Sequence, residues 1–427
     1  MLAISDQISS INTGFATLRT PSLMRTWMPN GKQWAAVTAA TWTLCSQWEL
    51  EDDFDLIRFV YTNNGGTAYT IQLAKVIASA SLGDGTTPLD STGASNFSFT
   101  QVFFNNAGAD VLPQDQTTWG SGTATLTVSG GTANVPVRFY SDWVRIPSTP
   151  RVDGGTRPIL MARHLTDTAG TYRCANFSSA TFSATTGNPK VLAYGQSGVD
   201  SVTTPAALSN PSALNFLTPD AVQYMTRTPG YSVLAVGDSL TQGFGATNNY
   251  QSWAFSACVG LSTTNLPISF WNQGWQGQTS DNFWSNSYTA FKGAKPDIVT
   301  ISTWSPNDGL TQAAADAGWS RAMDLANYCI KQGAVPVLMG PLPWGNITTA
   351  AQETARLSVR SRMLDAFAKG MAVLDWEQTM GTGASLNRIR TEYLSSDLLH
   401  PGDLGNSVMD KAVFRRVLAN ICGISLS

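Results

Sequence analysis

A serine and a histidine in the second half of the chain have neighbours that suit acyl transfer. Ser239 lies in Gly237–Leu240, directly after the apolar run Tyr231–Val236, which is typical of a buried strand. A serine hydroxyl becomes a nucleophile when a base takes its proton, and the base needs a partner that orients its ring. His400 follows Asp397 by three residues, so the carboxylate can hold one ring nitrogen while the other faces the serine. These residues predict a Ser239, His400 and Asp397 set for nucleophilic catalysis.

The alternatives for the base and its partner are few, because the chain has only two histidines. The other one, His164, has no acid beside it, and we interpret it as structural or surface-exposed. Asp375 and Asp403 are alternatives to Asp397, but neither has the same local relation to His400. A histidine-rich metal site is excluded by the same count, and we expect neither a metal nor another cofactor.

Composition narrows the function further. The net charge is only -3 and 13% of the residues are charged, so the basic surface that nucleic-acid binding requires is missing. No apolar run is long enough to span a bilayer. The start of the chain lacks the basic and apolar segments of a secretory signal. The protein could be cytoplasmic, phage-associated, or secreted with its leader removed, and the sequence does not decide between these locations.

Five scattered cysteines without a CxxC pair are expected to be buried hydrophobes rather than zinc ligands or a disulfide framework.

Two loops offer donors for the oxyanion that acyl transfer creates. The segment 272–279 contains Gly277, whose N–H can point into a site unhindered, and Gly274 is the alternative. The segment 305–309 contains Asn307, whose side-chain amide can donate. Each loop follows an expected strand, and the carboxyl ends of parallel strands meet at one edge of a sheet. We therefore expect both loops to lie near Ser239.

The elements that position these loops alternate between strand and helix. We expect strands over 231–236, 267–272, 297–302, 335–340 and 371–375, and helices over 250–261, 312–331, 350–369 and 404–421. This alternation predicts a parallel sheet with helices on both faces.

The first half of the chain has a different pattern. Between about 40 and 205 it is rich in short strand-like runs and turn residues, which predicts a β-sandwich of jelly-roll form. The runs 54–61 and 68–75 flank an Asn-Gly turn and predict a hairpin, as do 124–128 and 135–140. The proline-rich stretch 205–230 is expected to be a linker. We predict two domains, a β-rich domain at 1–220, with carbohydrate binding as a candidate role, and an α/β catalytic domain at 221–427.

The second half resembles the SGNH (GDSL) hydrolase superfamily of serine esterases. Four blocks in the family's order carry the resemblance, namely Gly237–Leu240, Gly277, Asn307 and Asp397–His400. The resemblance implies a flavodoxin-like three-layer α/β/α domain in which Ser239 is the nucleophile and also gives its N–H to the oxyanion hole. It implies Gly277 and Asn307 as the other two donors, His400 as the base and Asp397 as the residue that orients it.

One block departs from the family pattern, which usually reads Gly-x-Asn-Asp. Ser305 stands where that glycine would be. A side chain at this position affects how closely the Asn307 loop approaches the site, so this is the block whose geometry the resemblance determines least.

The substrate is a separate question, because the superfamily hydrolyses many esters. Trp275, Trp304 and Trp344 lie in or after the strand-end loops, where they are candidates for flat substrate-binding surfaces or for core packing. A β-sandwich joined to such a domain resembles some carbohydrate esterases and phage-tail deacetylases, which implies removal of acetyl or other short acyl groups from a carbohydrate. The alternatives are a general carboxylesterase or lipase-like enzyme on aryl or alkyl esters, and a binding or phage-tail structural protein with an inactive hydrolase domain. The oligomeric state is open.

Overall fold

Two compact units are distinguished in the computed structural model. The structure describes residues 22–28, 32–37, 41–132, 136–167, 170–175, 191–198, 200–204, 219–247, 251–384 and 386–426. The α/β unit contains Tyr231–Thr263 and Ile268–Ser427, and the β unit contains Leu23–Gly230 and Thr264–Pro267. The division into domains at residue 220 stays a prediction.

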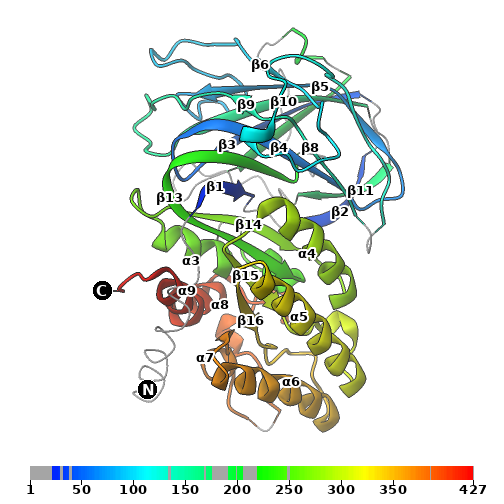
Figure 1. Ribbon diagram of the computed structural model, residues 1–427. Helices are drawn as coiled ribbons and strands as arrows, with labels where there is room; N and C mark the ends of the chain where they lie inside the picture. Colours follow the sequence, from blue (N-terminus) through cyan, green and yellow to red (C-terminus); the bar gives the residue numbers. More distant parts are fainter. Residues whose placement is uncertain are drawn as a thin grey trace. The chain divides into compact units, whose positions relative to one another are not determined.

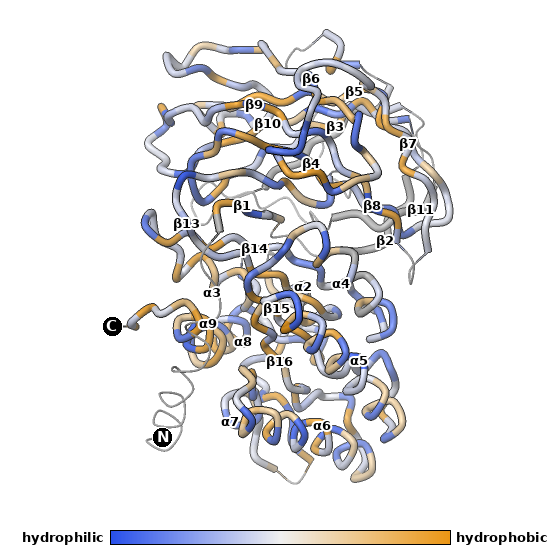
Figure 2. The backbone as a smooth tube through the Cα atoms, in the orientation of Figure 1, coloured by the Kyte–Doolittle hydropathy of each residue, from blue (hydrophilic) through white to orange (hydrophobic). Residues whose placement is uncertain are grey.

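The α/β unit is built on a parallel sheet (Figure 1). Its strands are β13 (Ala221–Gly237, from Tyr231 onward), β14 (Ile268–Gly274), β15 (Ile298–Ser302), β16 (Val335–Met339) and β17 (Ala372–Leu374). They lie in the order β14-β13-β15-β16-β17, and every pairing is parallel. Every residue of β14, β15 and β16 is buried, which matches the apolar colouring of β15 and β16 in Figure 2. The predicted α/β class of the second half is confirmed.

Helices lie on both sides of this sheet (Figure 1). On one side are α4 (Ser280–Ala294), α5 (Gln312–Lys331) and α6 (Ala350–Ala368), and on the other are α3 (Trp253–Leu261), α8 (Asp403–Val408) and α9 (Arg415–Cys422). The short α2 (Ser239–Gln242) and α7 (Glu377–Met380) follow β13 and β17. A π-helix, Met409–Phe414, joins α8 to α9, so the final helix predicted over 404–421 is interrupted. Helix α4, whose residues are largely polar, was not among the expected helices.

The β unit contains mostly antiparallel strands. The first sheet has the strand order β12-β3-β10-β5-β6, with β7 beside β5. In a second sheet, β4 pairs with β8, with β9 and with the first part of β13. Strands β2 and β11 pair with each other. The bounds are β1 Ser22–Trp27, β2 Lys32–Val37, β3 Thr41–Glu49, β4 Phe54–Asn63, β5 Tyr69–Ser79, β6 Thr100–Val102, β7 Leu126–Val128, β8 Val137–Tyr140, β9 Val144–Arg145, β10 Ile159–Asp167, β11 Gly170–Ala175 and β12 Val191–Ser197. The β-rich character predicted for the first half is confirmed.

Neither predicted hairpin forms. Strand β4 pairs with β13, β8 and β9, whereas β5 pairs with β10, β6 and β7, so the chain changes sheets between them. The same holds for β7 and β8. The first connection is folded by Asn63, whose side chain accepts the N–H of Gly65 at 2.8 Å and donates to the carbonyl of Thr67 at 2.8 Å. The second packs against it, with the Gly131 N–H donating to the Gly65 carbonyl at 2.8 Å. Asn and Gly mark a turn here, but the turn does not join paired strands.

The predicted linker over 205–230 is wrong in its second part. Residues 221–226 belong to β13 and pair antiparallel with β4, from Ala221 opposite Val60 to Thr226 opposite Phe54. The prolines suggested an extended connection, and an extended chain is also what an added strand requires. Residues 205–218 lie outside the described part of the chain.

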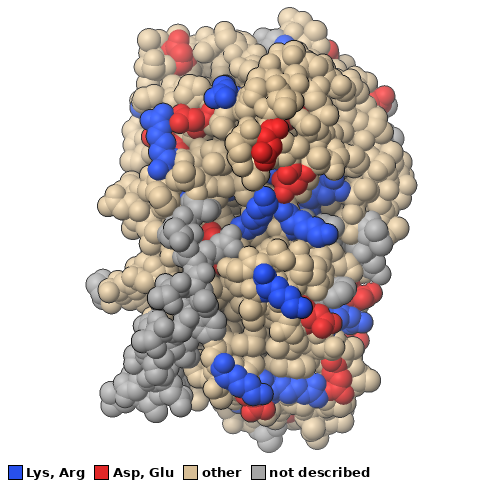
Figure 3. All heavy atoms as spheres, viewed as in Figure 1, with Lys and Arg blue, Asp and Glu red and all other residues tan. Residues whose placement is uncertain are grey.

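The charged residues are sparse at the surface. Figure 3 shows a mostly uncharged face on which acidic and basic side chains lie in small groups, several of them side by side. Among the helices in the described ranges, none is both long enough and apolar enough to cross a membrane.

Candidate active site

Ser239 stands on a tight turn at the carboxyl end of β13. Asp238 caps the following helix α2, because its side chain accepts the N–H of Leu240 at 2.9 Å. Gly237 is required by packing, since a Cβ at this position would lie 2.1 Å from the hydroxyl oxygen of Thr241. The turn holds Ser239 at the sheet edge with 7% of its surface exposed. In a sheet of this strand order, ligands bind near the point where the order reverses, which is beside β13.

The hydroxyl of Ser239 and the ring of His400 are joined directly. Ser239 Oγ lies 2.8 Å from His400 Nε2. His400 Nδ1 lies 2.6 Å from Asp397 Oδ2. The three residues that the sequence predicted are therefore brought into one hydrogen-bonded chain, although 161 positions separate Ser239 from His400.

The loop that carries His400 is folded around Asp397. Its Oδ1 accepts the hydroxyl of Ser395 at 2.6 Å and the N–H groups of Leu399 and His400, both at 2.9 Å. Leu398 takes a left-handed conformation with φ 57°, which is unusual for a side chain of this size. Partial burial acts to raise the pKa of Asp397, but the hydrogen bonds from Ser395 and His400 outweigh it and hold the pKa well below its usual range. Asp397 is thus kept ionised beside the imidazole.

A neighbouring loop packs against the imidazole. The ring of Phe244 meets that of His400 edge-on, with 4.7 Å between the centroids. Gly245 has φ 96°, and a Cβ there would lie 2.9 Å from the Cβ of His400. Phe244, Gly245 and Ser395 were not among the site residues predicted from the sequence. The Gly-x-Gly pattern at 243–245 was the available signal for a close backbone approach.

The alternative residues are engaged elsewhere. Asp375 pairs with Arg360 at 2.7 Å, and Asp403 accepts the N–H and hydroxyl of Thr247 at 2.7 and 2.6 Å. His164 belongs to the β unit, where its Nε2 lies 2.8 Å from the hydroxyl of Tyr61. Only 2% of His164 is exposed, so the expectation of a surface position was wrong and the structural interpretation holds. Burial lowers its pKa to about 3.

The two candidate oxyanion glycines have different surroundings. The N–H of Gly274 donates to the side chain of Asn272 at 2.9 Å, and a Cβ at Gly274 would lie 2.2 Å from the backbone nitrogen of Gln242. Gly274 therefore serves close packing. Gly277 is exposed and has φ 71°, a Cβ added to it would meet no atom within 4 Å, and among the described residues no backbone carbonyl accepts its N–H. These surroundings favour Gly277, whose role as a donor stays a prediction.

Asn307 follows β15 in a short 3-10 turn, Pro306–Asp308. Its side-chain amide donates to the carbonyl of Gln278 at 3.0 Å, which ties this loop to the Gly277 loop and leaves a second amide N–H for another acceptor. The two predicted donor loops are thus joined to each other by a hydrogen bond.

The sequence of this region is similar to that of a known enzyme family. Residues 235–408 match the model of the GDSL-like lipase/acylhydrolase family. The chain carries a GDSL-like acylhydrolase domain. The domain is that of an ester hydrolase, and it contains Ser239, Gly277, Asn307, Asp397 and His400.

Solved structures similar to this chain cover less than half of it. A lipolytic protein of the G-D-S-L family from Desulfitobacterium hafniense is 22% identical, with 44% of this chain and 99% of that chain covered and a TM-score of 0.37. A family 3 carbohydrate esterase from Clostridium thermocellum is 17% identical, with 44% and 94% covered and a TM-score of 0.35. An acetylxylan esterase from Geobacillus stearothermophilus is 19% identical, with 46% and 96% covered and a TM-score of 0.36. No curated protein matches the chain.

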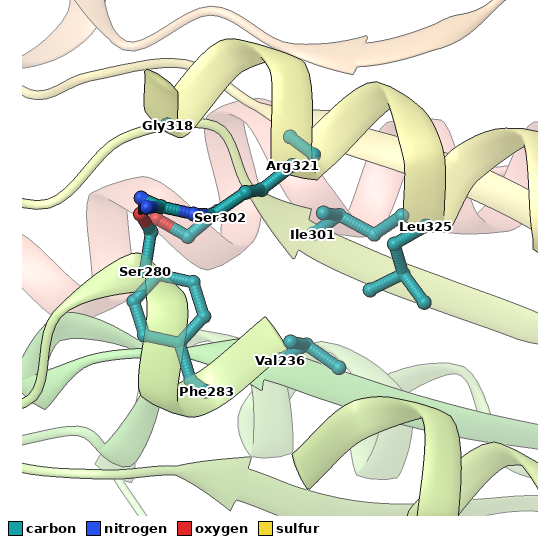
Figure 4. Close-up of a pocket in the computed structure, with 9 residues that line it drawn as sticks. Val236, Ser280, Phe283, Ile301, Ser302, Gly318, Arg321 and Leu325 are labelled. Atoms are coloured by element: carbon teal, nitrogen blue, oxygen red, sulfur yellow. Dashed lines mark hydrogen bonds between the residues drawn. The ribbon is translucent and has the colours of Figure 1, made fainter. Parts of the chain in front are cut away.

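A partly buried polar network supports the Asn307 loop of the acylhydrolase domain. Asp308 accepts the N–H and hydroxyl of Ser280 at 2.8 and 3.0 Å and the N–H of Ser305 at 3.1 Å. Arg321 on α5 donates to the hydroxyl of Ser280 at 2.9 Å, and Figure 4 shows its side chain reaching from α5 to the start of α4. Burial raises the pKa of Asp308, and the hydrogen bonds from Ser280 and Ser305 oppose that rise. The loop is therefore anchored to two helices.

The three tryptophans that the sequence suggested as substrate-binding residues do not offer flat faces to solvent. Trp275, Trp304 and Trp344 are 0%, 1% and 5% exposed. Trp304 and Trp344 pack edge-on against each other with 5.4 Å between centroids. Of the two interpretations of these residues, core packing is the one that their burial supports. The expectation that they line a substrate surface is corrected accordingly.

Metal-ligating side chains and cysteines add no second site in the described part of the chain. Among the described residues, no group of three or more His, Cys, Asp or Glu side chains is arranged to hold a metal ion. The four cysteines whose side chains are described are buried, namely Cys45, Cys258, Cys329 and Cys422.

Proposed function

We propose that this chain hydrolyses short-chain acyl esters, with an acylated carbohydrate as the substrate, through an acyl-enzyme on Ser239. The observation that carries the proposal is the continuous chain from Ser239 Oγ to His400, at 2.8 Å, and from His400 to Asp397, at 2.6 Å. Such a chain is the arrangement that makes a serine hydroxyl nucleophilic.

In the proposed reaction His400 takes the proton of Ser239 as Oγ attacks the ester carbonyl. Asp397 holds the imidazole by Nδ1 and stabilises the positive charge that forms on the ring. The N–H groups of Ser239 and Gly277 and the amide of Asn307 receive the negative oxygen of the tetrahedral intermediate. His400 then gives the proton to the leaving alcohol, and a water molecule releases the acyl group in the same sequence of proton transfers.

The surroundings of the proposed oxyanion site favour a polar substrate. Gly277 and Asn307 are exposed, and Gln276 and Gln278 beside them are partly exposed. Amide side chains of this kind bind hydroxyl groups well and long alkyl chains poorly. An exposed apolar side chain favours the second candidate, a general carboxylesterase: Leu398, in the loop of His400, is 65% exposed. The intact Ser239–His400–Asp397 chain is the argument against an inactive binding or structural protein.

We also propose that the β unit is a β-sandwich, for which a jelly-roll form and a carbohydrate-binding role are the working hypothesis. Its support is that side chains of the two sheets meet, since Tyr61 on β4 bonds to His164 on β10 and Phe59 packs edge-on against the same ring, with 5.2 Å between centroids. A glycan-binding screen with the full chain carrying Ser239→Ala tests the binding role without turnover. Absence of binding to every glycan would leave the unit an architectural role.

The hydrolase proposal is tested with p-nitrophenyl acetate. Ser239→Ala is expected to lower kcat by on the order of 10⁴-fold or more. Ser358→Ala, a serine on α6 whose hydroxyl donates to the carbonyl of Ala355, is the matched control and should keep wild-type activity. Equal turnover by wild type and Ser239→Ala would refute the mechanism. Acetate release from acetylated polysaccharides, compared with a chain-length series of aryl esters, then separates the carbohydrate esterase from the general carboxylesterase.

A further inference from the structure

The residue that departs from the family pattern makes a direct bond beneath the nucleophile. The hydroxyl of Ser305 donates to Oδ2 of Asp238 at 2.5 Å. Ser305 is fully buried and Asp238 is 2% exposed. The two residues follow β13 and β15, which are neighbouring strands of the parallel sheet. A glycine at position 305 would have no hydroxyl to make this bond.

Asp238 and Ser305 each make a further hydrogen bond, one on either side of the bond between them. The other carboxylate oxygen of Asp238 accepts the Leu240 N–H at 2.9 Å and so fixes the turn on which Ser239 stands. The oxygen of Ser305 accepts the Asn307 N–H at 3.3 Å and so fixes the loop of Asn307. The hydrogen bonds therefore run without interruption from the nucleophile turn to the donor loop.

We propose that Ser305 is a positioning residue, which acts through Asp238 to set the spacing between Ser239 and Asn307. The inference rests on the proposed function, because the spacing matters when both residues donate to one oxyanion. Ser305 itself does not contact the substrate. Oxyanion donors act through preorganised geometry, so a small displacement of one loop relative to the other weakens the stabilisation of the transition state.

The bond also bears on the charge of Asp238. Burial raises the pKa of this carboxyl, while the hydrogen bonds from Ser305 and Leu240 and the positive charge that His400 can carry favour the ionised form; Asp308 opposes it. Without the hydroxyl, one carboxylate oxygen would lose its partner in a buried place, and a buried acceptor without a partner is costly. The turn would then shift, or the Asp238 carboxylate would take up a proton. Either change would move Ser239.

The first test measures catalysis with p-nitrophenyl acetate. Ser305→Ala and Ser305→Gly are expected to lower kcat by roughly 10- to 100-fold, the value of one hydrogen bond to a charged group, and to change KM by less than about 2-fold. The matched control is Ser302→Ala, a buried serine on β15 whose hydroxyl donates to the Trp304 carbonyl at 3.2 Å. A phosphonate ester that labels Ser239 counts the intact sites in each variant. If kcat per labelled site is the same in Ser305→Ala and Ser302→Ala, the positioning role is wrong.

The second test does not depend on turnover. Urea unfolding is measured for Ser305→Ala, Asp238→Ala and the double variant. Because Ser305 is bonded to Asp238, the double variant should lose less stability than the sum of the two single variants; the loss that Ser305→Ala adds to Asp238→Ala is that of the Ser305–Asn307 bond. If the shift of the unfolding midpoint in the double variant equals the sum of the two single shifts, the Ser305–Asp238 bond does not link the two loops. If Asp238→Ala does not fold, Asp238→Asn takes its place, and a smaller departure from additivity is expected.

The experiments distinguish a failure of the proposed function from a failure of the positioning role. Ester turnover that survives Ser239→Ala would contradict the proposed function while the unfolding measurements still report on the Ser305–Asp238 bond. Additive unfolding shifts together with a Ser239-dependent esterase would contradict the positioning role alone.

Discussion

Asp397 holds His400 by its ring and by its backbone. One carboxylate oxygen lies 2.6 Å from Nδ1 of the imidazole, and the other accepts the His400 N–H at 2.9 Å. The carboxylate therefore fixes both where the residue lies and how its ring is turned. An acid placed elsewhere in the chain, such as Asp375, would have to achieve both through separate contacts.

Asp397→Asn is expected to lower kcat for p-nitrophenyl acetate by on the order of 10⁴-fold, because the amide does not hold the imidazole in the tautomer that accepts the serine proton. Steady-state kinetics measure the change. Asp375→Asn is the control, since Asp375 pairs with Arg360 and does not contact His400. A similar loss of kcat in both variants would argue for a general structural effect instead.

His164→Gln is expected to keep ester turnover and to change how stability depends on pH. Burial lowers the pKa of His164 from 6.5 to about 3, so the folded chain binds fewer protons than the unfolded chain between these values. The stability associated with the neutral ring is complete above about pH 6.5 and is lost as the pH falls towards 3.

Urea unfolding at pH 7.5 and pH 5.0 measures this effect. Wild type should lose more stability between the two values than His164→Gln. Parallel losses would contradict a buried neutral ring, and a fall in kcat would point to His164 as a base.

Gly274→Ala and Gly277→Ala are expected to differ sharply in thermal unfolding. At Gly274 the added Cβ meets the backbone of Gln242 at 2.2 Å, so we expect overpacking to cost about 1–3 kcal/mol or more. At Gly277 no atom lies within 4 Å, and the cost is that of the left-handed conformation alone, about 1 kcal/mol. A lower Tm for Gly277→Ala than for Gly274→Ala would reverse the roles assigned to the two glycines.

Trp344→Ala is expected to destabilise the acylhydrolase domain by about 3–5 kcal/mol, as the loss of a buried tryptophan does. Its packing partner Trp304 is 1% exposed, so the cavity would lie inside the core. KM for p-nitrophenyl acetate should stay unchanged in the fraction that is folded. Urea unfolding and steady-state kinetics on the same preparation separate the two effects, and a raised KM without lost stability would restore a substrate-binding role.

The α/β half was predictable because its strands are buried on both faces and read as short apolar runs. Ile298–Ser302 and Val335–Met339 lie within the ranges expected from the sequence. The helix Ser280–Ala294 is largely polar and buries only one face, through Phe283, Phe291 and Ala294, and this helical spacing was not used in the prediction. The loops at the sheet edge were predictable as a group. The preference for Gly277 over Gly274 stays a prediction, which the hydrogen bond from Gly274 to Asn272 supports.

In the β-rich half, the sequence pattern predicts where strands lie but not which strands pair with one another. The runs around Phe54–Asn63 and Tyr69–Ser79 were correctly expected as strands, but their partners are far along the chain. A turn signal such as Asn63–Gly66 determines where the chain bends and not which sheet it enters next. Similarly, no local signal near Ser305 indicates that its hydroxyl would meet Asp238, 67 positions away.

The burial of His164 has a practical consequence for chemical labelling. A reagent such as diethyl pyrocarbonate, which carbethoxylates imidazole, finds two histidines in the sequence but only one with exposed side-chain surface, because His164 is 2% exposed and the His400 side chain 17%. In the folded protein the absorbance change of this modification therefore counts a single ring, and its rate reports how freely small electrophiles reach the imidazole beside Ser239.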